Sequence, residues 1–228
     1  PSGVLKMAEK FWIVFGDVHE SLSNIHKIED IRKASGVLVS GDLTNVGNRS
    51  RAGALIDEIK SLNGNVYAQV GNMDTTEVEK YLEETGMNIH NKVVSLSDEV
   101  YVLGLGYSTP TPFSTPSEVS EDQVKSWLDK VVDQALKVKH LIFLSHTPPQ
   151  NTKADRLGAG ANVGSPAVRA FIEKVQPEVC VTGHIHEAVS VDHIGKTIVI
   201  NPGTFGSGGY VRISFDGQNL KAELRQVK

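Results

Sequence analysis

The chain lacks the features of a disulfide-stabilised or membrane-spanning protein. It has one cysteine among 228 residues, so it cannot form an internal disulfide, and this is compatible with a reducing compartment. That cysteine, Cys180, lies in the apolar run "VCVTG", where we expect a buried and inert thiol. No apolar run approaches the roughly 18 residues that a membrane span requires. We therefore expect a cytoplasmic protein that binds no membrane.

An excess of positive charge is also missing. The chain carries 23 Lys and Arg against 27 Asp and Glu, which gives a net charge of −4. Proteins that bind nucleic acid usually present a basic face, so this composition argues against a nucleic-acid partner. A single local site could still bind a small phosphate ester, including a nucleotide.

Internal repeats, low-complexity tracts and convincing linkers are absent as well. A length of 228 residues fits one large domain, and we expect a single domain over residues 1–228. The first ten residues, "PSGVLKMAEK", have no apolar run typical of a secretory signal. We expect Met7 to be the native start and part of residues 1–10 to be a tag or disordered. The sequence sets no oligomeric state.

Short apolar segments alternate with helical patterns in the first half of the chain. The pattern predicts strands at 11–15, 36–40 and 66–70 and helices at 21–34, 49–61 and 75–84. Such alternation is typical of βαβ units, in which helices cover both faces of a parallel sheet.

The second half of the chain is richer in hairpins, with turns such as "HIGK" and "FDGQN" between its last strands. We expect paired strands at 92–96 and 99–105, helices at about 117–137 and 165–175, buried strands at 140–145 and 178–183, and further strands at 187–193, 196–200, 209–215 and 219–226. Together the two halves predict an α/β fold with two mixed β-sheets flanked by helices.

Five polar clusters share one position, directly after the end of a predicted strand. They read "FGDVHE", "SGDLTN", "VGNMDT", "LSHTPP" and "TGHIHE". Ligands of open α/β sheets bind at that edge. One Gly-Asp pair or one histidine there is more often a turn or a structural residue, but the whole set is hard to explain in this way. It comprises Asp17, His19, Asp42, Asn72, His146, His184 and His186.

The residue types in these clusters suggest a two-metal site. Carboxylate and imidazole ligands together suit Mn, Fe or Zn better than Ca or Mg, which prefer oxygen ligands only. The set contains no thiolate, which argues against a structural zinc site. One carboxylate can bridge two cations roughly 3.5–4 Å apart, and such a pair clamps an in-line displacement at phosphorus.

The ordered motifs "GDVHE … GDLTN … GNMD … SHTPP … GHIH" resemble those of the calcineurin-like metallophosphoesterases. The resemblance spans residues 11 to about 205 and is closest to the small prokaryotic branch related to Icc-type phosphodiesterases. It implies a four-layer αββα sandwich, and it implies hydrolysis of phosphate esters by a hydroxide that bridges two divalent metal ions, with Mn favoured. The implied ligands are Asp17, His19 and His186 for one metal, Asn72, His146 and His184 for the other, and Asp42 as the bridge.

One position departs from the family pattern. The third motif usually has a histidine that helps the leaving group depart, and Met73 occupies its place. A thioether donates no proton, and loss of a general acid typically costs about 10²–10⁴-fold when the leaving group is poor. We therefore expect phosphodiesters to be preferred over monoesters. The alternative is a catalytically weak or inactive fold used as a protein-interaction module, as in the retromer subunit of this family. Asp74, the usual partner of that histidine, receives no catalytic role and could face either the site or solvent.

Two loops are candidates for substrate binding. The segment 151–165 carries Lys153 and Arg156, which could meet the phosphate as part of a lid or belong to a solvated loop. The Pro-rich segment 108–113 ends in Phe113, which could stack on a base or aryl group or could cover the core. Asn201 is expected to support the site from behind the ligands.

Overall fold

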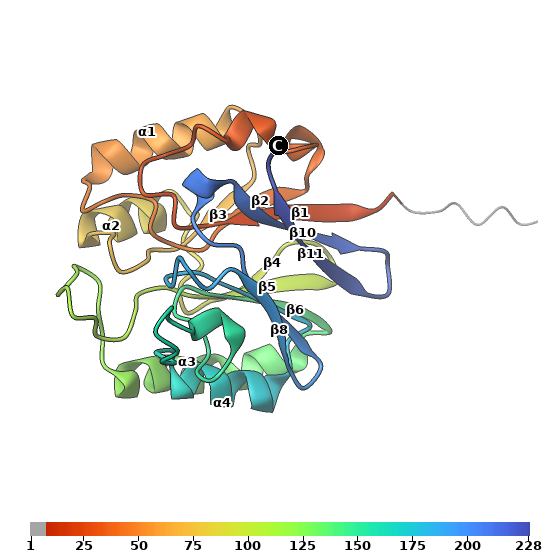
Figure 1. Cartoon of the computed structure of the whole chain (residues 1–228). Helices are drawn as coiled ribbons and strands as arrows, with labels where there is room; N and C mark the ends of the chain where they lie inside the picture. Colours follow the sequence, from red (N-terminus) through yellow and green to blue (C-terminus); the bar gives the residue numbers. More distant parts are fainter. Residues whose placement is uncertain (1–7) are drawn as a thin grey trace, which may run out of the picture.

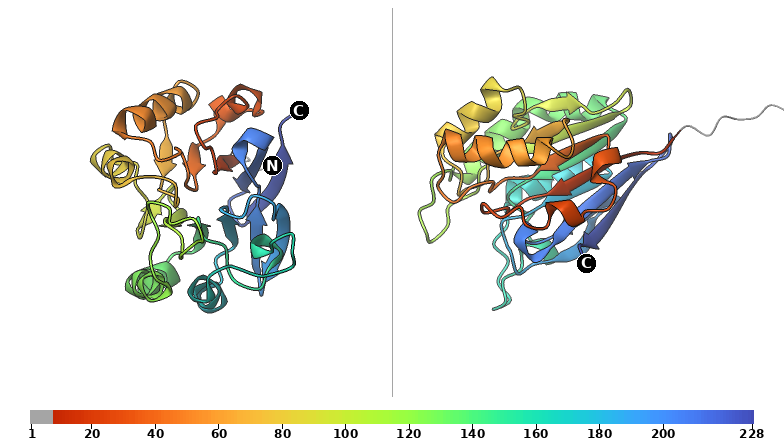
Figure 2. Two further views of the ribbon diagram at one scale, coloured as in Figure 1. Left: turned by 60° about the vertical axis from the view of Figure 1, so that its left-hand side comes forward. Right: turned by 90° about the horizontal axis from the view of Figure 1, so that it is seen from above.

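Two β-sheets lie face to face between two pairs of helices in the computed structural model, which describes residues 8–228 (Figure 1). Helices α1 (Arg49–Lys60) and α2 (Thr76–Glu84) cover one sheet, and α3 (Glu121–Lys137) and α4 (Pro166–Val175) cover the other. The left view in Figure 2 shows the same separation of the helix pairs. The predicted α/β fold and its four-layer αββα arrangement are confirmed, whereas the expectations for residues 1–7, Met7 included, lie outside the described residues.

The first sheet has five strands in the order β11-β10-β1-β2-β3. Its strands β1, β2 and β3 are parallel, and β10 and β11 extend the sheet by antiparallel pairing. The bounds are β1 Lys10–Phe15, β2 Gly36–Val39, β3 Val66–Ala68, β10 Gly209–Phe215 and β11 Leu220–Gln226.

The second sheet has six strands in the order β4-β5-β6-β7-β9-β8. Its four inner strands are parallel, and the edge strands β4 and β8 pair antiparallel with their neighbours. The bounds are β4 Val93–Ser95, β5 Val100–Leu105, β6 His140–Ser145, β7 Val179–Thr182, β8 Ser190–Ile194 and β9 Thr197–Asn201. Within residues 8–228, no helix has the length and apolar character of a membrane span.

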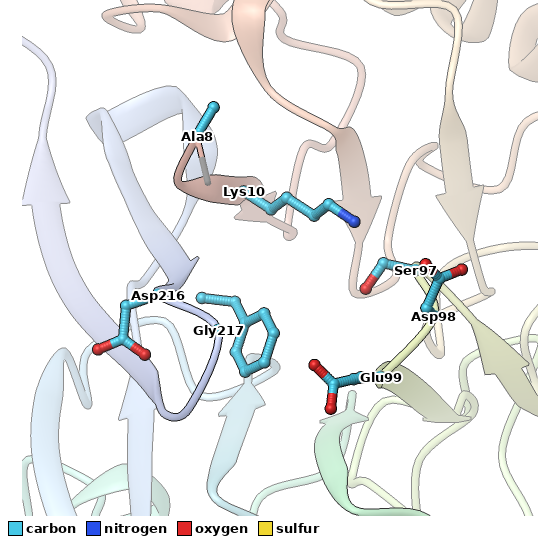
Figure 3. Close-up of a pocket in the computed structure, with 8 residues that line it drawn as sticks. Ala8, Lys10, Ser97, Asp98, Glu99, Asp216 and Gly217 are labelled. Carbon is cyan, nitrogen blue, oxygen red and sulfur yellow. The ribbon is translucent and has the colours of Figure 1, made fainter. Parts of the chain in front are cut away.

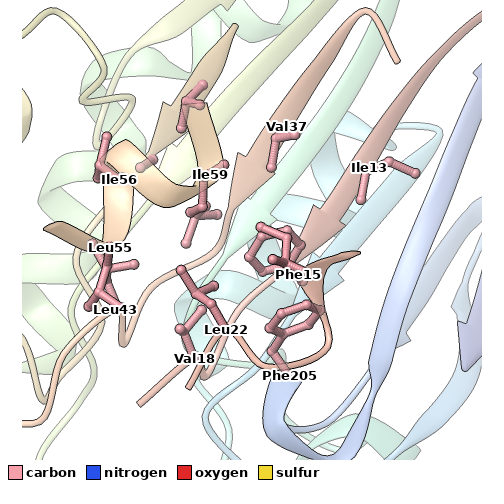
Figure 4. Packing of buried hydrophobic residues seen from close by; sticks show 14 of the residues in the cluster. Ile13, Phe15, Val18, Leu22, Val37, Leu43, Leu55, Ile56, Ile59 and Phe205 are labelled. Carbon is pink, nitrogen blue, oxygen red and sulfur yellow. The ribbon is translucent and has the colours of Figure 1, made fainter. Parts of the chain in front are cut away.

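Strand β1 shows how the core is divided between the layers. Successive side chains of a strand point to opposite faces, so Trp12 and Val14 pack between the two sheets. Ile13 and Phe15 instead face the first helix pair, where Phe15 stacks on Phe205 with ring centroids 4.2 Å apart (Figure 4). Because both faces of β1 are covered, the strand reads as a continuous apolar run in the sequence.

The helix expected at 21–34 is wrong. The segment forms two 3₁₀ turns, Ile25–Lys27 and Ile31–Lys33, and Asp30 between them has a left-handed backbone with φ of 59°. The buried residues Leu22, Ile25, Ile28 and Ile31 recur at every third position. This is the period of a 3₁₀-helix, whereas an α-helix alternates steps of three and four.

Two other boundaries differ from the prediction for a local reason. Helix α3 begins at Glu121 instead of 117, because the Ser120 side chain caps it by accepting from the backbone N–H of Gln123. The strand expected at 187–193 begins at Ser190, because the chain before it forms the turn that carries two of the candidate ligands. Cys180 lies buried in β7, and burial raises the pKa of its thiol, as expected for an inert group.

Candidate metal centre

All seven candidate ligands lie at one edge of the two sheets, where the parallel strands end. Asp17 and His19 follow β1, and Asp42 and Asn72 follow β2 and β3. From the second sheet, His146 follows β6, and His184 and His186 follow β7. The two sheets thus supply ligands from opposite sides of one site, as expected for the carboxyl ends of parallel strands.

We call Asp17, His19 and His186 the outer group. Together with Asp42 they place one ligand atom each within 4.8 Å of one another. The Nε2 atoms of His19 and His186 are 3.1 Å apart, and His186 Nε2 is 3.3 Å from Asp17 Oδ1. The His186 side chain is 46% exposed and that of His19 is 21% exposed.

We call Asn72, His146 and His184 the inner group. The Asn72 Oδ1 atom is 2.9 Å from His146 Nε2 and 2.8 Å from His184 Nδ1. His146 is fully buried and Asn72 nearly so. Two imidazole nitrogens and an amide oxygen therefore converge on one point.

Asp42 belongs to both groups. Its Oδ2 atom lies 3.6 Å from His19 Nε2 and 3.4 Å from His146 Nε2. Its Oδ1 atom accepts a 2.8 Å hydrogen bond from the backbone N–H of Met73, which fixes the carboxylate plane. Burial alone would raise the pKa of Asp42, but the charge and hydrogen bond of His146 outweigh it and bring the pKa to about 2. The carboxylate is therefore ionised at neutral pH.

Residues behind the ligands set the orientation of two imidazoles. The Nδ1–H of His19 donates to Asn45 Oδ1 at 2.7 Å, and that of His146 donates to the Ser40 carbonyl at 3.2 Å. Each Nε2 then points into the site, which is the usual arrangement of a metal-binding histidine. Asn45 was missed from the sequence, although it closes the motif "SGDLTN".

Asp74 lies behind the site and does not face it. It is fully buried and accepts from the backbone N–H groups of Leu43, Thr44 and Gly71 at 2.8–3.1 Å. Burial, and then the charge of Asp42, raises the pKa of Asp74 to about 6. The carboxylate thus ties the loop that carries Asp42 to the loop that carries Asn72.

The ligand turns are held in backbone conformations that few residues adopt. Asp17, His19, Asp42 and His184 have φ between 45° and 68°, a left-handed region in which strain is typical of functional sites. The chain also passes close to two carboxylates: a Cβ on Gly71 would lie 2.2 Å from Asp42 Oδ1, and one on Gly183 would lie 2.4 Å from Asp17 Oδ2. Glycine at these positions gives the carboxylates their room.

The two histidines of the inner group lie in different electrostatic environments. Burial would lower the pKa of His146, but Asp42 raises it to about 9. Burial, and then the charge of His146, lowers the pKa of His184 to about 4. The position at His146 therefore favours positive charge, which is the electrostatic condition for a cation beside Asp42.

The donor set fits divalent transition metals. The ligand atoms are carboxylate oxygens, imidazole nitrogens and one amide oxygen, and this mixture suits Mn, Fe or Zn. Several of these atoms face one another at 2.8–3.6 Å. Ligand atoms that face one another at such distances are suited to hold a cation between them.

Five of the seven candidate ligands form the floor of an open cleft of about 1100 Å³, namely His19, Asp42, Asn72, His184 and His186. One wall is the segment Thr109–Pro116, on which Phe113 is 82% exposed. Val46, Leu157, Val163 and Ile185 add further apolar surface, and Met73 lies on the floor beside Asn72. Within residues 8–228, no Lys or Arg side chain lines the cleft, and Glu187 is its one charged group apart from the ligands.

Lys153 and Arg156 are exposed and, in the described part of the chain, are not among the residues that line the cleft. Their loop is pinned by buried Asp155, which accepts from the backbone N–H groups of Thr152 and Gly164 at 2.9 and 2.8 Å. Such a pinned loop does not suit a mobile lid. Asn201, in contrast, is fully buried and donates to the Ile185 carbonyl at 2.9 Å, between the two ligands of the "GHIH" turn.

A second pocket lies at the opposite end of the sheets, where β1 begins. It measures about 50 Å³ and is lined by Lys10, Asp98, Glu99 and Asp216, among others (Figure 3). This volume accommodates only one or a few water molecules. The large cleft is therefore the site with room for a substrate.

Comparison with known proteins agrees with this geometry. The model of the calcineurin-like phosphoesterase family matches residues 13–188. The uncharacterized protein MJ1162 of Methanocaldococcus jannaschii is 35% identical over 175 residues, which cover 74% of this chain and 77% of that protein.

Two solved structures share the fold. TT1561 of Thermus thermophilus has a TM-score of 0.72 at 17% identity, with 96% of this chain and 99% of that chain covered. A dimetal phosphatase from Danio rerio has a TM-score of 0.61 at 11% identity, again with 96% and 99% covered. The family match implies a metal-dependent hydrolase of phosphoric esters. The chain belongs to the calcineurin-like phosphoesterase family.

Proposed function

We propose that this protein is a dinuclear metal-dependent phosphoesterase that prefers phosphodiesters. The observation that carries the proposal is the position of Asp42 Oδ2, within 3.6 Å of a histidine nitrogen from the outer group and 3.4 Å of one from the inner group. A single carboxylate oxygen between two sets of ligands is the arrangement that a bridge between two cations requires.

The two groups would divide the cations between them. The outer group and Asp42 would hold one, and the inner group and Asp42 would hold the other. Bound there, the pair would supply Lewis acidity to the phosphoryl oxygens and lower the pKa of water. The chain itself orients the ligands: Asn45 and Ser40 hold His19 and His146, and the Met73 N–H holds Asp42.

The charge of the cleft supports the preference for diesters. A phosphodiester carries one negative charge, whereas a monoester carries up to two at neutral pH. No Lys or Arg from the described chain lines the cleft, and Glu187 adds a negative charge. The absence of an imidazole at Met73 also favours esters whose leaving group departs without a proton.

The apolar wall of the cleft supports an aryl or nucleobase substituent. Phe113 is 82% exposed at the rim, and stacking on an aromatic side chain is worth about 1–3 kcal/mol for a nucleic acid base.

We further propose Mn²⁺ as the working metal, because the ligands include carboxylates, imidazoles and an amide but no thiolate. A cytoplasmic location remains our proposal from the lone buried cysteine.

The test compares an aryl phosphodiester with the matching aryl monoester, using metal-stripped protein reloaded with Mn²⁺. We expect turnover of the diester to exceed that of the monoester, and to be lost with chelator and in the variant Asn72→Ala. The variant Asn219→Ala changes an exposed asparagine in the β10–β11 turn and should keep full activity.

The second candidate function is a protein-interaction module, favoured by Met73 in the place of the usual histidine. It would be supported if neither ester is hydrolysed although two metal ions bind per chain. That result would contradict the phosphoesterase proposal for these substrates.

A further inference from the structure

The amide of Asn72 has to be oriented before it can bind a cation. Its oxygen and nitrogen ends have similar shapes, but only the oxygen end can act as a ligand. In the structure, Oδ1 faces His146 and His184, and Nδ2 donates to Thr115 Oγ1 at 3.0 Å. Thr115 lies on the cleft wall and belongs to neither ligand group.

The direction of this hydrogen bond is set one step further away. A threonine hydroxyl has one proton, and that of Thr115 is donated to Glu118 Oε1 at 2.6 Å. Its lone pairs are thus left to accept from Asn72. The chain Asn72 to Thr115 to Glu118 can run in one direction only, because an ionised carboxylate accepts and does not donate.

Glu118 is itself held in place. The same Oε1 atom accepts from Thr111 Oγ1 at 2.5 Å and from the Thr115 backbone N–H at 2.8 Å. Burial would raise the pKa of Glu118, but the hydrogen bonds from Thr111 and Thr115 bring it to about 2. The group is therefore an anion throughout the working range of pH.

The backbone of the wall is joined to the same ligand loop. The Ser117 N–H donates to the Asn72 carbonyl at 2.9 Å, and the Ser117 hydroxyl donates to the Asp74 carbonyl. The wall and the inner group are therefore connected by both main-chain and side-chain contacts.

We propose that Thr115 and Glu118 are positioning residues that hold the Asn72 amide with its oxygen toward His146 and His184. The affinity of the inner group for a cation then depends on the ordered conformation of the cleft wall. The inference rests on the proposed two-metal function. Residues behind metal ligands typically change metal affinity by 10–100-fold when they are removed.

The test titrates metal-free protein with Mn²⁺ by calorimetry, as the wild type and as the variants Thr115→Val, Thr115→Ser and Glu118→Met. Valine has the shape of threonine but cannot accept from Asn72, so we expect the affinity for one Mn²⁺ to fall about 10–100-fold. The other Mn²⁺ should bind as before. Serine keeps the hydroxyl and should restore the affinity. Glu118→Met removes the acceptor of the Thr115 hydroxyl and should lower the affinity for the same Mn²⁺ as valine does.

Thr109→Val is the matched control, because Thr109 lies on the same wall but takes no part in the contacts to Asn72. The melting temperature of each metal-free variant shows that it is folded. Unchanged affinity for both metals in Thr115→Val would overturn the inference alone. Binding of only one Mn²⁺ by the wild-type protein would overturn the inference together with the two-metal proposal. Two bound Mn²⁺ without ester hydrolysis, but with the Thr115→Val loss, would overturn only the enzymatic function.

Discussion

The two halves of the metal centre differ most in their exposure to solvent. The inner group is built around fully buried His146 and nearly buried Asn72, whereas the outer group includes His186, whose side chain is 46% exposed. A buried ligand set is held in place by its packing, and an exposed set can exchange with solvent. We therefore expect the inner group to act as the structural anchor of the centre and the outer group as its open side.

The largest effect should come from the one residue that both halves share. Asp42→Asn keeps the shape of the side chain but removes its charge, and so weakens both cation sites. Because each cation contributes several kcal/mol to transition-state stabilisation, we expect kcat/KM for the aryl diester to fall by about 10³-fold or more. Metal analysis should show less than two Mn²⁺ per chain. Two retained metals with activity within tenfold of wild type would exclude Asp42 as the bridge.

The second prediction compares how much each half of the centre contributes to the stability of the folded protein. His146→Ala leaves the buried Asp42 carboxylate without its partner, and losing one member of a buried charged pair costs about 3–5 kcal/mol. His186→Ala removes a half-exposed side chain and should cost less than about 1 kcal/mol. Urea unfolding of the metal-free variants measures both values. Equal losses would show that the inner group is not the more firmly packed half.

His90, a half-buried histidine outside the metal centre, gives the predicted pH dependence of stability. Burial, and then the charge of Lys92, lowers the pKa of His90 to about 4, and its Nδ1 accepts from the Gly106 N–H. The unfolded chain binds this proton more tightly, so the stability that neutral His90 contributes is present above about pH 6.5 and is lost as the pH falls towards 4. We expect this contribution to the free energy of unfolding to change by about 3 kcal/mol between pH 6.5 and pH 4.

The measurement is the free energy of unfolding between pH 4 and 7, for wild type and for His90→Asn, whose amide oxygen can still accept from Gly106. The difference between the two proteins should grow as the pH rises. A constant difference would mean that His90 does not titrate in this window.

The smallest predicted effect lies on the cleft wall. Phe113→Ala removes an exposed ring without touching a ligand, so we expect KM for an aryl diester to rise about tenfold, in keeping with the lower part of the stacking range. The value of kcat should change little, and KM for a methyl diester should not change. An equal rise for both esters would point to a general change of the wall instead of stacking.

The sequence predicted the layers, and it singled out seven candidate ligands that the structure brings to one edge of the sheets, because both depend on local signals. Apolar runs such as that of β1 report burial on both faces, and the polar residue after each run reports the end of a strand. The same local logic failed at 21–34, where the spacing of Leu22, Ile25, Ile28 and Ile31 was that of a 3₁₀-helix and was interpreted as an α-helix.

The supporting residues could not be predicted because their partners are distant in the chain. Asp74 binds backbone groups 30 and 31 positions earlier, and Asn72 meets Thr115 43 positions later. Neither contact produces a periodic pattern or a motif. The substrate-binding role of Lys153 and Arg156 stays a prediction. Their absence from the cleft lining could not be read from the sequence for a related reason, because the course of their loop depends on its anchor, here Asp155.

The most direct test of the two-metal centre is a titration of metal-free protein with Mn²⁺, followed by electron paramagnetic resonance and by diester hydrolysis. If Asp42 bridges two ions, the second equivalent should replace the signal of isolated Mn²⁺ with that of a spin-coupled pair, and activity should rise with the same equivalent. Saturation at one Mn²⁺ per chain, or two ions without coupling, would contradict the account.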